Sequence, residues 1–407
     1  MTNKLKILND PIYGFITIPD TLIFDIIEHP YFQRLRRISQ MGLSNMVYPG
    51  AHHTRFHHVV GCMYLMQKAV RVLKSKGVAI AKSEEQALNI AILLHDIGHG
   101  PFSHALEYFF VPEITHEELS LAFMEKLNVE FDGALSEAIA VFKNKHPRKF
   151  LFQLISSQLD MDRLDYLKRD SFYTGVVEGS INSDRLIAML NVENDELVIE
   201  QKGIYSVEKF LLSRRFMYWQ VYFHKTGLLA EKLLLRVLER VRELLQNGEK
   251  VVASENLIYF LHGVEDSNEI SAFLQKFSEL DDYDVWSALK NWKNHDDFVL
   301  AALSTMIIER KLPKVEMSDS PFSDTYKARK YKRVLMKEGV TKDNLHYFLF
   351  DGKVSNQAYN KKEGAIKVLL KDGSVKEWGT VDSQFDTKTL TQPTTRYYFA
   401  YPKGIDV

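Results

Sequence analysis

Histidine and aspartate residues form a metal-binding pattern in the first half of the chain. His95 and Asp96 are adjacent in the segment HDIGHGPFSH, His58 opens an apolar helical pattern upstream, and Asp162 lies downstream in SQLDMDRLDYLKRD. Imidazole nitrogen and carboxylate oxygen suit divalent ions, and two carboxylates favour Mn, Fe or Mg over Zn. Four such ligands leave positions open for water and phosphate oxygen, as a catalytic metal requires. We therefore predict a catalytic metal site at these four residues.

A histidine next to an aspartate also occurs by chance, and many buried histidines are only hydrogen-bonded core residues. The continuation GHGPFSH favours the metal site, because its glycines and proline bend the chain sharply beside the pair. His99, His104 and His116 lie near predicted helix ends, where backbone amides help to bind phosphate. We expect one of them to protonate a leaving oxygen, since histidine titrates closest to neutral pH. For His99 and His116, orientation of the ligands and water is an equal alternative.

A nucleotide pocket is indicated by Arg163, Tyr166 and Asp170, which share one helix face at spacings of three and seven residues. The guanidinium would bind phosphate, the ring would pack on a sugar, and the carboxylate would accept from a sugar hydroxyl. Taken alone, such a face is also typical of a solvated helix. We interpret Asp165 and Arg169, four residues apart, as a solvated charge pair of that kind.

Two further segments combine basic and aromatic residues. Residues 214–225 read RRFMYWQVYFHK, which fits phosphate and base contacts, although such rings are more often core. Residues 327–333 read KARKYKR. A solvated surface is the default interpretation of this second cluster, and contact with a polyanion or nucleotide is the alternative.

Helical patterns must position these groups. Ser83 with Gln86, and Thr115 with Glu118, have the spacing of capping boxes that start helices. Apolar residues at three- and four-residue steps predict further helices over residues 150–169 and 205–245. Short alternating runs at 197–200, 365–370 and 396–400 predict strands, with a turn at residues 372–373.

We therefore expect a mainly α protein, a helical bundle with a small mixed α+β C-terminal lobe. The predicted division is an N-terminal arm with short helices (1–50), a helical catalytic domain (51–317) and the C-terminal lobe (318–407). The best boundary candidate is residues 318–323, with Pro321.

The composition is that of an ordinary globular protein, with 407 residues, 45% hydrophobic and 26% charged, and a formal net charge of -1. No overall field draws it to nucleic acid or to an anionic membrane. The single cysteine, Cys62, excludes an internal disulfide and favours a reducing compartment. No segment has the roughly 20 apolar residues of a membrane span, and the N-terminus lacks a signal-peptide core, so we expect a cytoplasmic protein.

Seven motifs occur in an order that resembles the HD-domain deoxynucleoside triphosphate triphosphohydrolases, both the bacterial enzymes and the mammalian enzyme with SAM and HD domains. They are NDPIYGFI from Asn9, FQRLRRISQMG from Phe32, YPGAHHTRFHHVVG from Tyr48, LLHDIGHGPFSHALE from Leu93, THEE from Thr115, LDMDRLDYLKRD from Leu159 and YFHK from Tyr222. The resemblance covers about the first 230 residues and fades through the C-terminal lobe.

The resemblance implies removal of the whole triphosphate from a dNTP, which yields a deoxynucleoside and tripolyphosphate. By resemblance the metal ligands match His58, His95, Asp96 and Asp162, the catalytic histidine matches His104, and a supporting histidine matches His116. Glu107 stands where the family has an aspartate that supports the catalytic histidine. The positions that hold sugar and phosphates match Gln40, Arg55, Arg163, Tyr166, Asp170, Arg214 and Tyr222. Gln40 and Asp170 would bind the 3′-hydroxyl, and Tyr222 would exclude a ribose 2′-hydroxyl.

The mammalian type is also activated by nucleotides bound between the subunits of an oligomer, so the resemblance implies a homo-oligomer, a dimer or tetramer, with a nucleotide activator. The positions that match this activator site are Asn9, Gln33, Arg36, Val47, Arg185, His224 and Lys225. Glu28 stands where an aspartate reads guanine in that site.

Two other function classes fit the same residues. One is an HD phosphodiesterase or pyrophosphohydrolase that acts on a nucleotide second messenger or a short oligonucleotide. The other is a nucleotide sensor without turnover, or a nucleic-acid-binding assembly that uses the KARKYKR cluster.

Overall fold

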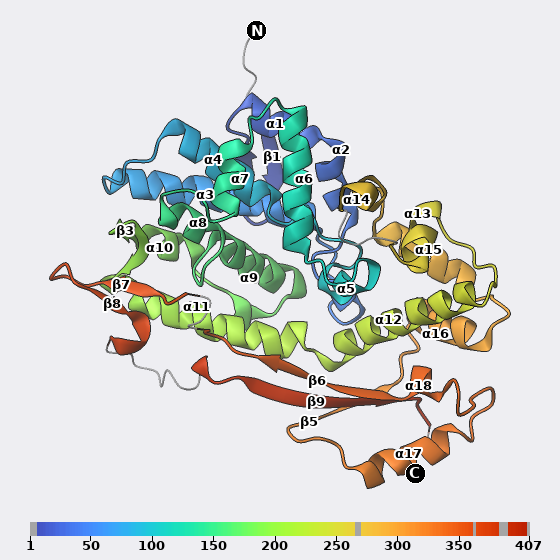
Figure 1. Cartoon of the computed structure of the whole chain (residues 1–407). Helices are drawn as coiled ribbons and strands as arrows, with labels where there is room; N and C mark the ends of the chain where they lie inside the picture. Colours follow the sequence, from blue (N-terminus) through green and yellow to red (C-terminus); the bar gives the residue numbers. More distant parts are fainter. Residues whose placement is uncertain (1–5, 265–269, 361–363, 382–389, 405–407) are drawn as a thin grey trace.

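The computed structural model describes residues 6–264, 270–360, 364–381 and 390–404, and most of it is helical up to residue 310 (Figure 1). The fold is mainly α with a small mixed C-terminal lobe, which confirms the predicted class. The helices of the first part are α1 (Thr21–Glu28), α2 (Pro30–Gln33), α3 (Arg55–Ser75), α4 (Lys82–Leu94), α5 (Glu107–Phe110), α6 (His116–Glu130), α7 (Ser136–Phe142), α8 (Lys149–Ile155), α9 (Met161–Thr174), α10 (Ser183–Ala188), α11 (Ile204–Met217), α12 (Lys225–Gln246), α13 (Glu255–His262), α14 (Ile270–Ser278), α15 (Asp282–Trp292) and α16 (Phe298–Ile308).

The helices that carry the chemistry pack directly on one another. Helix α3 contacts both α4 and α9, and its inward face is buried along most of its length. At Gly61 of α3 an added Cβ would lie 2.2 Å from Asp165 Oδ1 and 2.2 Å from an Arg169 nitrogen. Only glycine therefore lets α9 approach α3 this closely.

The two predicted capping boxes have different outcomes. Thr115 accepts from the Glu118 N–H and Glu118 accepts from the Thr115 N–H, so α6 begins as predicted. The prediction for Ser83 and Gln86 is wrong, because α4 already begins at Lys82. The carboxylate of Glu84 accepts from the N–H of residue 81, and Gln86 donates instead to Asp20, 3.0 Å away.

Three small sheets complete the part of the fold that the structure describes. Strands β1 (Ile7–Asp10) and β2 (Gly14–Thr17) form an N-terminal hairpin. The second sheet has the order β3-β4-β7-β8, and the third has the order β5-β9-β6. Their bounds are β3 (Leu190–Glu193), β4 (Glu196–Glu200), β7 (Lys367–Leu369), β8 (Val375–Glu377), β5 (Lys314–Ser318), β9 (Thr394–Tyr401) and β6 (Phe350–Asn356). The predicted strands near residues 197, 367 and 396 are all present.

The C-terminal segment attaches to the bundle in two ways. Strand β7 pairs in parallel with β4, and its hairpin with β8 turns at the predicted position, where Gly373 has a φ of 83°. Figure 1 shows α12 running between the helical bundle and the sheet of β5, β9 and β6. The lobe also contains α17 (Asp324–Val334) and α18 (Leu345–Phe348). We keep the division at residue 318 as a proposal, and note that β5 already belongs to the sheet of the lobe.

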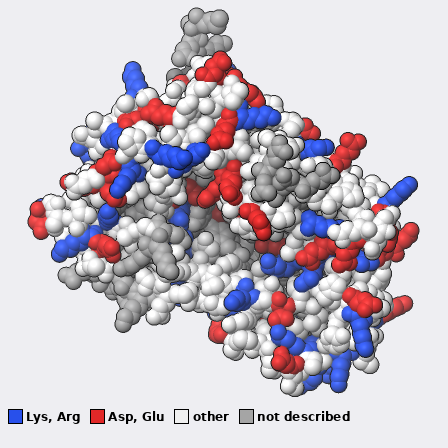
Figure 2. All heavy atoms as spheres, in the orientation of Figure 1, with Lys and Arg blue, Asp and Glu red and all other residues white. Residues whose placement is uncertain are grey.

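The surface mixes both signs of charge. Figure 2 shows basic and acidic side chains interspersed over the visible face. Within the KARKYKR cluster on α17, Lys327 forms an ion pair with Asp351, and Lys330 is buried against the Tyr401 hydroxyl. Among the described residues, no helix is both long enough and apolar enough to cross a membrane.

Candidate functional site

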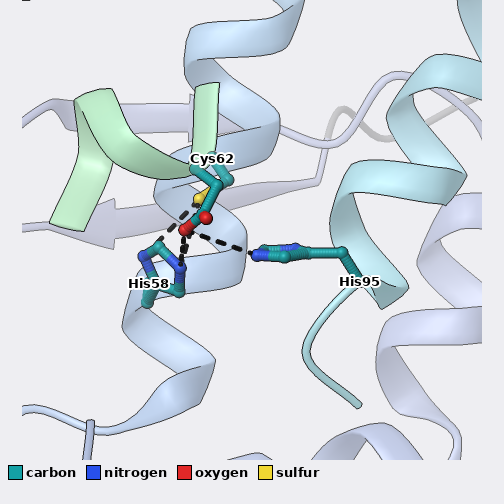
Figure 3. A group of neighbouring side chains, drawn as sticks. His58, Cys62 and His95 are labelled. Carbon is teal, nitrogen blue, oxygen red and sulfur yellow. Dashed lines mark hydrogen bonds and ion pairs between the residues drawn. The ribbon is translucent and has the colours of Figure 1, made fainter. Parts of the chain in front are cut away.

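The four predicted metal ligands come from three helices and meet at one point. His58 lies in the first turn of α3, His95 is the C-terminal cap of α4 with Asp96 directly after it, and Asp162 lies in the first turn of α9. The Oδ1 atom of Asp162 is 3.0 Å from His58 Nε2 and 3.6 Å from His95 Nε2. Asp96 lies 3.6 Å from His58 and 3.4 Å from His95. Figure 3 shows His58 and His95 facing each other from their two helices.

The hydrogen bonds on the far sides of the two imidazoles orient them for a metal. His58 Nδ1 lies 2.8 Å from Asp165 Oδ2, and His95 Nδ1 lies 2.6 Å from the carbonyl oxygen of Ile92. Because these acceptors take the Nδ1 protons, each Nε2 lone pair is directed into the cluster. His95 Nε2 is buried and forms no hydrogen bond with any residue that the structure describes. A buried nitrogen of this kind is costly unless it is satisfied, so the donor set fits a divalent ion.

The charge of the cluster also suits a cation. Burial by itself would raise the pKa of Asp162, but the close contact with His58 and the charge interaction with His95 outweigh it and hold that pKa well below its usual value. The pKa of Asp96 is likewise held low, by His95 and Arg55 against its burial. Both carboxylates are therefore ionised at neutral pH.

Cys62 lies one turn along α3 from His58, with its Sγ 3.5 Å from His58 Nδ1 (Figure 3). Its thiol is completely buried, and burial raises its pKa well above the usual value. Its sulfur lies in the same group of potential ligand atoms as the side chains of His58, His95 and Asp162.

The interpretation of Asp165 and Arg169 as a solvated pair is wrong. Both side chains are completely inaccessible, and they form a two-point ion pair with distances of 2.8 Å and 3.0 Å. Arg169 also binds Asp10, 2.8 Å away in the N-terminal hairpin. Since Asp165 holds His58, this buried network orients a metal ligand. The spacing of four residues is the same for an exposed pair and a buried one, so the pattern could not distinguish them.

The other three predicted histidines, His99, His104 and His116, form a second group beside the cluster. The rings of His99 and His116 stack at 4.0 Å, and His99 Nε2 lies 3.3 Å from Asp96. Glu107, at the start of α5, accepts from His104 at 3.0 Å and also contacts His116. Burial alone would raise the pKa of Glu107, but these hydrogen bonds outweigh it and hold the pKa well below its usual value. His99 is different, because burial and the nearby Arg55 hold its pKa well below the usual value and keep it neutral.

The turn that carries His104 has a strained backbone. Phe102 and Ser103 have φ of 56° and 53°, in the left-handed region that favours glycine. Asp282 accepts from the Phe102 N–H at 2.8 Å, and the Ser103 hydroxyl donates to the carbonyl of Ser39 at 2.8 Å. Strain of this kind persists where surrounding contacts impose it, commonly at functional sites.

All the predicted sugar and phosphate residues line one cavity of about 590 Å³, together with Asp96, Asp162, His104 and His116. They are Gln40, Arg55, Arg163, Tyr166, Asp170, Arg214 and Tyr222. His58 and His95 lie behind this wall. The Oε1 atom of Gln40 is buried and has no hydrogen-bond partner in the described part of the chain, which suits an atom that binds a ligand.

Tyr222 and Asp170 form a hydrogen-bonded pair in the wall of the cavity. Tyr222 lies in a π-helical turn (Tyr218–Tyr222), and its hydroxyl donates to Asp170 Oδ2 at 2.8 Å. The other oxygen, Asp170 Oδ1, lies 2.7 Å from His53 Nε2. Short π-helical insertions are frequent at functional sites. His53 was not predicted as a site residue, because no motif distinguishes it from the neighbouring histidines of HHTRFHH.

The eight predicted activator residues lie in several parts of the fold, of which the turn before Val47 contacts helix α12, and Tyr48 beside it packs on His224. Gln33 accepts from Arg36 at 2.8 Å near Glu28, whereas Arg185 on α10 bonds Ser206 at 3.1 Å. The others are Asn9 on β1, Val47 after the turn at residues 44–46, and His224 with Lys225 at the start of α12. Within the described part of the chain, no hydrogen bond or ion pair joins these groups.

Comparisons with known proteins match the part of the chain that contains the four predicted metal ligands. The HD domain family matches residues 55–170, and the family described as HD associated region matches residues 181–262. The uncharacterized protein YwfO of Bacillus subtilis is 33% identical over 77% of this chain and 74% of that protein. A deoxynucleoside triphosphate triphosphohydrolase SAMHD1 homolog of Dictyostelium discoideum is 32% identical over 54% of this chain and 46% of that protein, so the chain spans less than half of that relative's length. The crystal structure of a phosphohydrolase from Bacteroides thetaiotaomicron superposes with a TM-score of 0.94 at 47% identity, covering 98% of this chain and 100% of that chain.

Proposed function

The chain belongs to the HD-domain family of phosphohydrolases, and from this membership we propose that it cleaves a deoxynucleoside triphosphate into a deoxynucleoside and tripolyphosphate. One observation supports the proposal above all. The metal cluster, His104 and the Tyr222–Asp170 pair all open onto the same cavity of about 590 Å³. This arrangement offers sites for phosphate, for a departing oxygen and for a sugar within one enclosure.

His58, His95, Asp96 and Asp162 would hold the metal. Mn, Mg and Fe suit two imidazoles and two carboxylates best, and Zn is the fourth candidate. A divalent ion bound there would supply Lewis-acid polarisation of the α-phosphate and an activated water. The chain's own part is to fix the ligands, with Asp165 and the Ile92 carbonyl holding the two imidazoles.

Three arginines of the cavity wall would bind the triphosphate. Arg163 is kept in place by Asp160, the N-terminal cap of α9, through a contact of 3.1 Å. Arg214 donates to Gln158 at 3.2 Å, and Arg55 donates to Ser103 at 2.9 Å. Guanidinium groups held in this way can bind phosphate oxygens at two points without first losing side-chain freedom.

His104 would give its proton to the 5′ oxygen as the bond to phosphorus breaks. Its side chain is 64% exposed, so it can reach a ligand, and Glu107 holds its Nδ1 from behind. The contact with Glu107 fixes the orientation of the ring, and a general acid must be held within reach of the oxygen that it protonates. Gln40 and Asp170 would bind the 3′-hydroxyl, and the Tyr222 ring would leave no room for a 2′-hydroxyl.

The decisive test is chromatographic analysis of products from the four dNTPs, singly and mixed, and from the four ribonucleotides, with Mn or Mg. We expect tripolyphosphate and deoxynucleoside from dNTPs and no turnover of ribonucleotides. Mono- or pyrophosphate as the only inorganic product would contradict the proposal, and turnover of ribonucleotides or short oligonucleotides would favour a phosphodiesterase or pyrophosphohydrolase. Nucleotide binding without turnover would favour a sensor. A higher rate with mixed dNTPs, together with a larger particle in solution, would support nucleotide activation of a homo-oligomer.

Replacing Glu107 with glutamine should lower kcat and alter its dependence on pH. The amide keeps the shape but removes the negative charge that contacts His104 and His116, so the imidazoles lose the carboxylate that holds them. We expect kcat to fall by about 10- to 100-fold, since general acid catalysis contributes about 10²- to 10⁴-fold and is only partly lost. The kcat profile, measured between pH 5.5 and 9 (roughly the range of histidine titration), should differ in shape from that of the unchanged protein.

The matched control is Glu117→Gln, an exposed position in the first turn of α6. This variant should retain both the rate and the pH profile of the unchanged protein. A Glu107→Gln variant that changes KM alone, with the profile in place, would show that Glu107 has no part in proton transfer.

A further inference from the structure

The substrate cavity contains an acidic side chain that the proposed chemistry does not use. Glu231 lies in the second turn of α12 and lines the cavity. Of the other acidic residues of the wall, Asp96 and Asp162 belong to the metal cluster, and Asp170 is bonded to Tyr222. The carboxyl group of Glu231 forms no hydrogen bond or ion pair with any residue that the structure describes.

The position of this carboxyl group is set by a turn of the chain. A Cβ on Gly42 would lie 3.0 Å from Glu231 Oε1 and 3.3 Å from the carbonyl oxygen of Phe102. Gly42 has a φ of 50°, and Met41 and Phe102 also line the cavity. The carboxyl group therefore meets the cavity beside the backbone of Gly42 and Phe102, with Met41 next to them. A polar group next to an apolar residue suits the edge and the face of a base.

Because the carboxyl group of Glu231 is shielded from water, hydrogen-bond donors from a ligand would stabilise its ionised form. Burial raises the pKa of Glu231 to about 7, although the charge of Lys232 opposes the shift. An ionised carboxylate that has lost water gains most from a ligand with two adjacent N–H groups, one for each oxygen. A ligand that leaves one oxygen facing a lone pair is disfavoured.

Among the four bases, only guanine presents two adjacent donors, N1–H and the 2-amino group, on its pairing edge. Adenine and cytosine each place one amino group beside a ring nitrogen with a lone pair. Thymine has one N–H between two carbonyl oxygens. A carboxylate therefore discriminates in favour of guanine, whereas an amide in its place would match the donor and acceptor edge of adenine.

We propose that Glu231 reads the pairing edge of the substrate base and selects guanine over the other three bases. This assignment rests on the proposed function, because it places the base of a deoxynucleotide in the cavity beyond the sugar residues. It also assigns a role to Glu231 that differs from metal binding, proton transfer and sugar recognition.

The test compares kcat/KM for the four dNTPs in the unchanged protein, Glu231→Gln and Glu239→Gln. Glu239 lies two turns along α12, outside the cavity wall, and pairs with Arg236. We expect dGTP to be preferred, and Glu231→Gln to lower the ratio of dGTP to dATP by about 10- to 100-fold, the effect of one two-point base contact. Glu239→Gln should keep the original preference. An equal loss for all four dNTPs, or no preference for dGTP in the unchanged protein, would overturn the assignment.

Calorimetric affinities in a His104→Ala background separate this inference from the proposed reaction. If no dNTP yields tripolyphosphate but Glu231→Gln still weakens dGTP binding selectively, the base assignment stands and the proposed reaction is wrong. If tripolyphosphate forms but Glu231→Gln leaves the relative affinities of the four dNTPs unchanged, the reaction stands and the base assignment is wrong.

Discussion

Replacing Asp162 with alanine should remove the bound metal and abolish turnover. Asp162 is the ligand nearest to both imidazoles of the cluster, 3.0 Å from His58 Nε2 and 3.6 Å from His95 Nε2. Without it, two imidazoles and one carboxylate remain, and the wall of the cavity loses an ionised oxygen. We expect kcat/KM to fall by at least about 1,000-fold, because the metal supplies several kcal/mol of transition-state stabilisation.

Two measurements on the same purified samples check this expectation. Elemental analysis gives the metal content per chain, and product chromatography gives kcat/KM. The matched control is Asp184→Ala, which removes an exposed carboxylate that pairs with Lys68 on the surface, and should change neither quantity. A full complement of metal in Asp162→Ala, with turnover near that of the unchanged protein, would show that the reaction does not depend on this cluster.

The sequence could indicate that the four predicted ligands lie together because they belong to ordered motifs and because the spacing of residues in a helix sets the direction of their side chains. Asp162 and Arg163 follow the N-terminal cap of α9, so their types and positions together indicated a functional end of this helix. The structure explains why the first glycine of HDIGHG, Gly98, is required, which the sequence alone could not. A Cβ at Gly98 would lie 2.2 Å from the His116 carbonyl oxygen, so this glycine lets the metal segment pack against α6.

Other features depend on contacts between distant parts of the chain, which no local pattern records. Asp10 and Arg169 are 159 residues apart, and only folding shows that their ion pair is buried. Glu231 belongs to an amphipathic helix in which a charged residue looks ordinary until the cavity is located. The early start of α4 has a similar cause, because Glu84 is also held by Arg148, 2.9 Å away in a later segment.

Replacing Arg169 with methionine should destabilise the protein severely. Arg169 is completely buried and bonds Asp165 and Asp10, and the pKa of Asp165 is held below its usual value by that guanidinium against the effect of burial. Methionine fills much of the space but leaves two buried carboxylates without their partner. Breaking a buried ion pair in this way costs about 3–5 kcal/mol of the free energy of unfolding.

Urea unfolding of Arg169→Met beside Arg71→Met measures this cost. Arg71 is exposed on α3, so its substitution should change the free energy of unfolding by less than about 0.5 kcal/mol. Equal stabilities of the two variants would show that the buried network is not a major contribution. The same network predicts a selective second effect, because Asp165 would lose the cation that fixes it while it still bonds His58 Nδ1. We therefore expect the folded fraction of Arg169→Met to bind metal about 10- to 100-fold more weakly, as when a group that orients a metal ligand is disturbed.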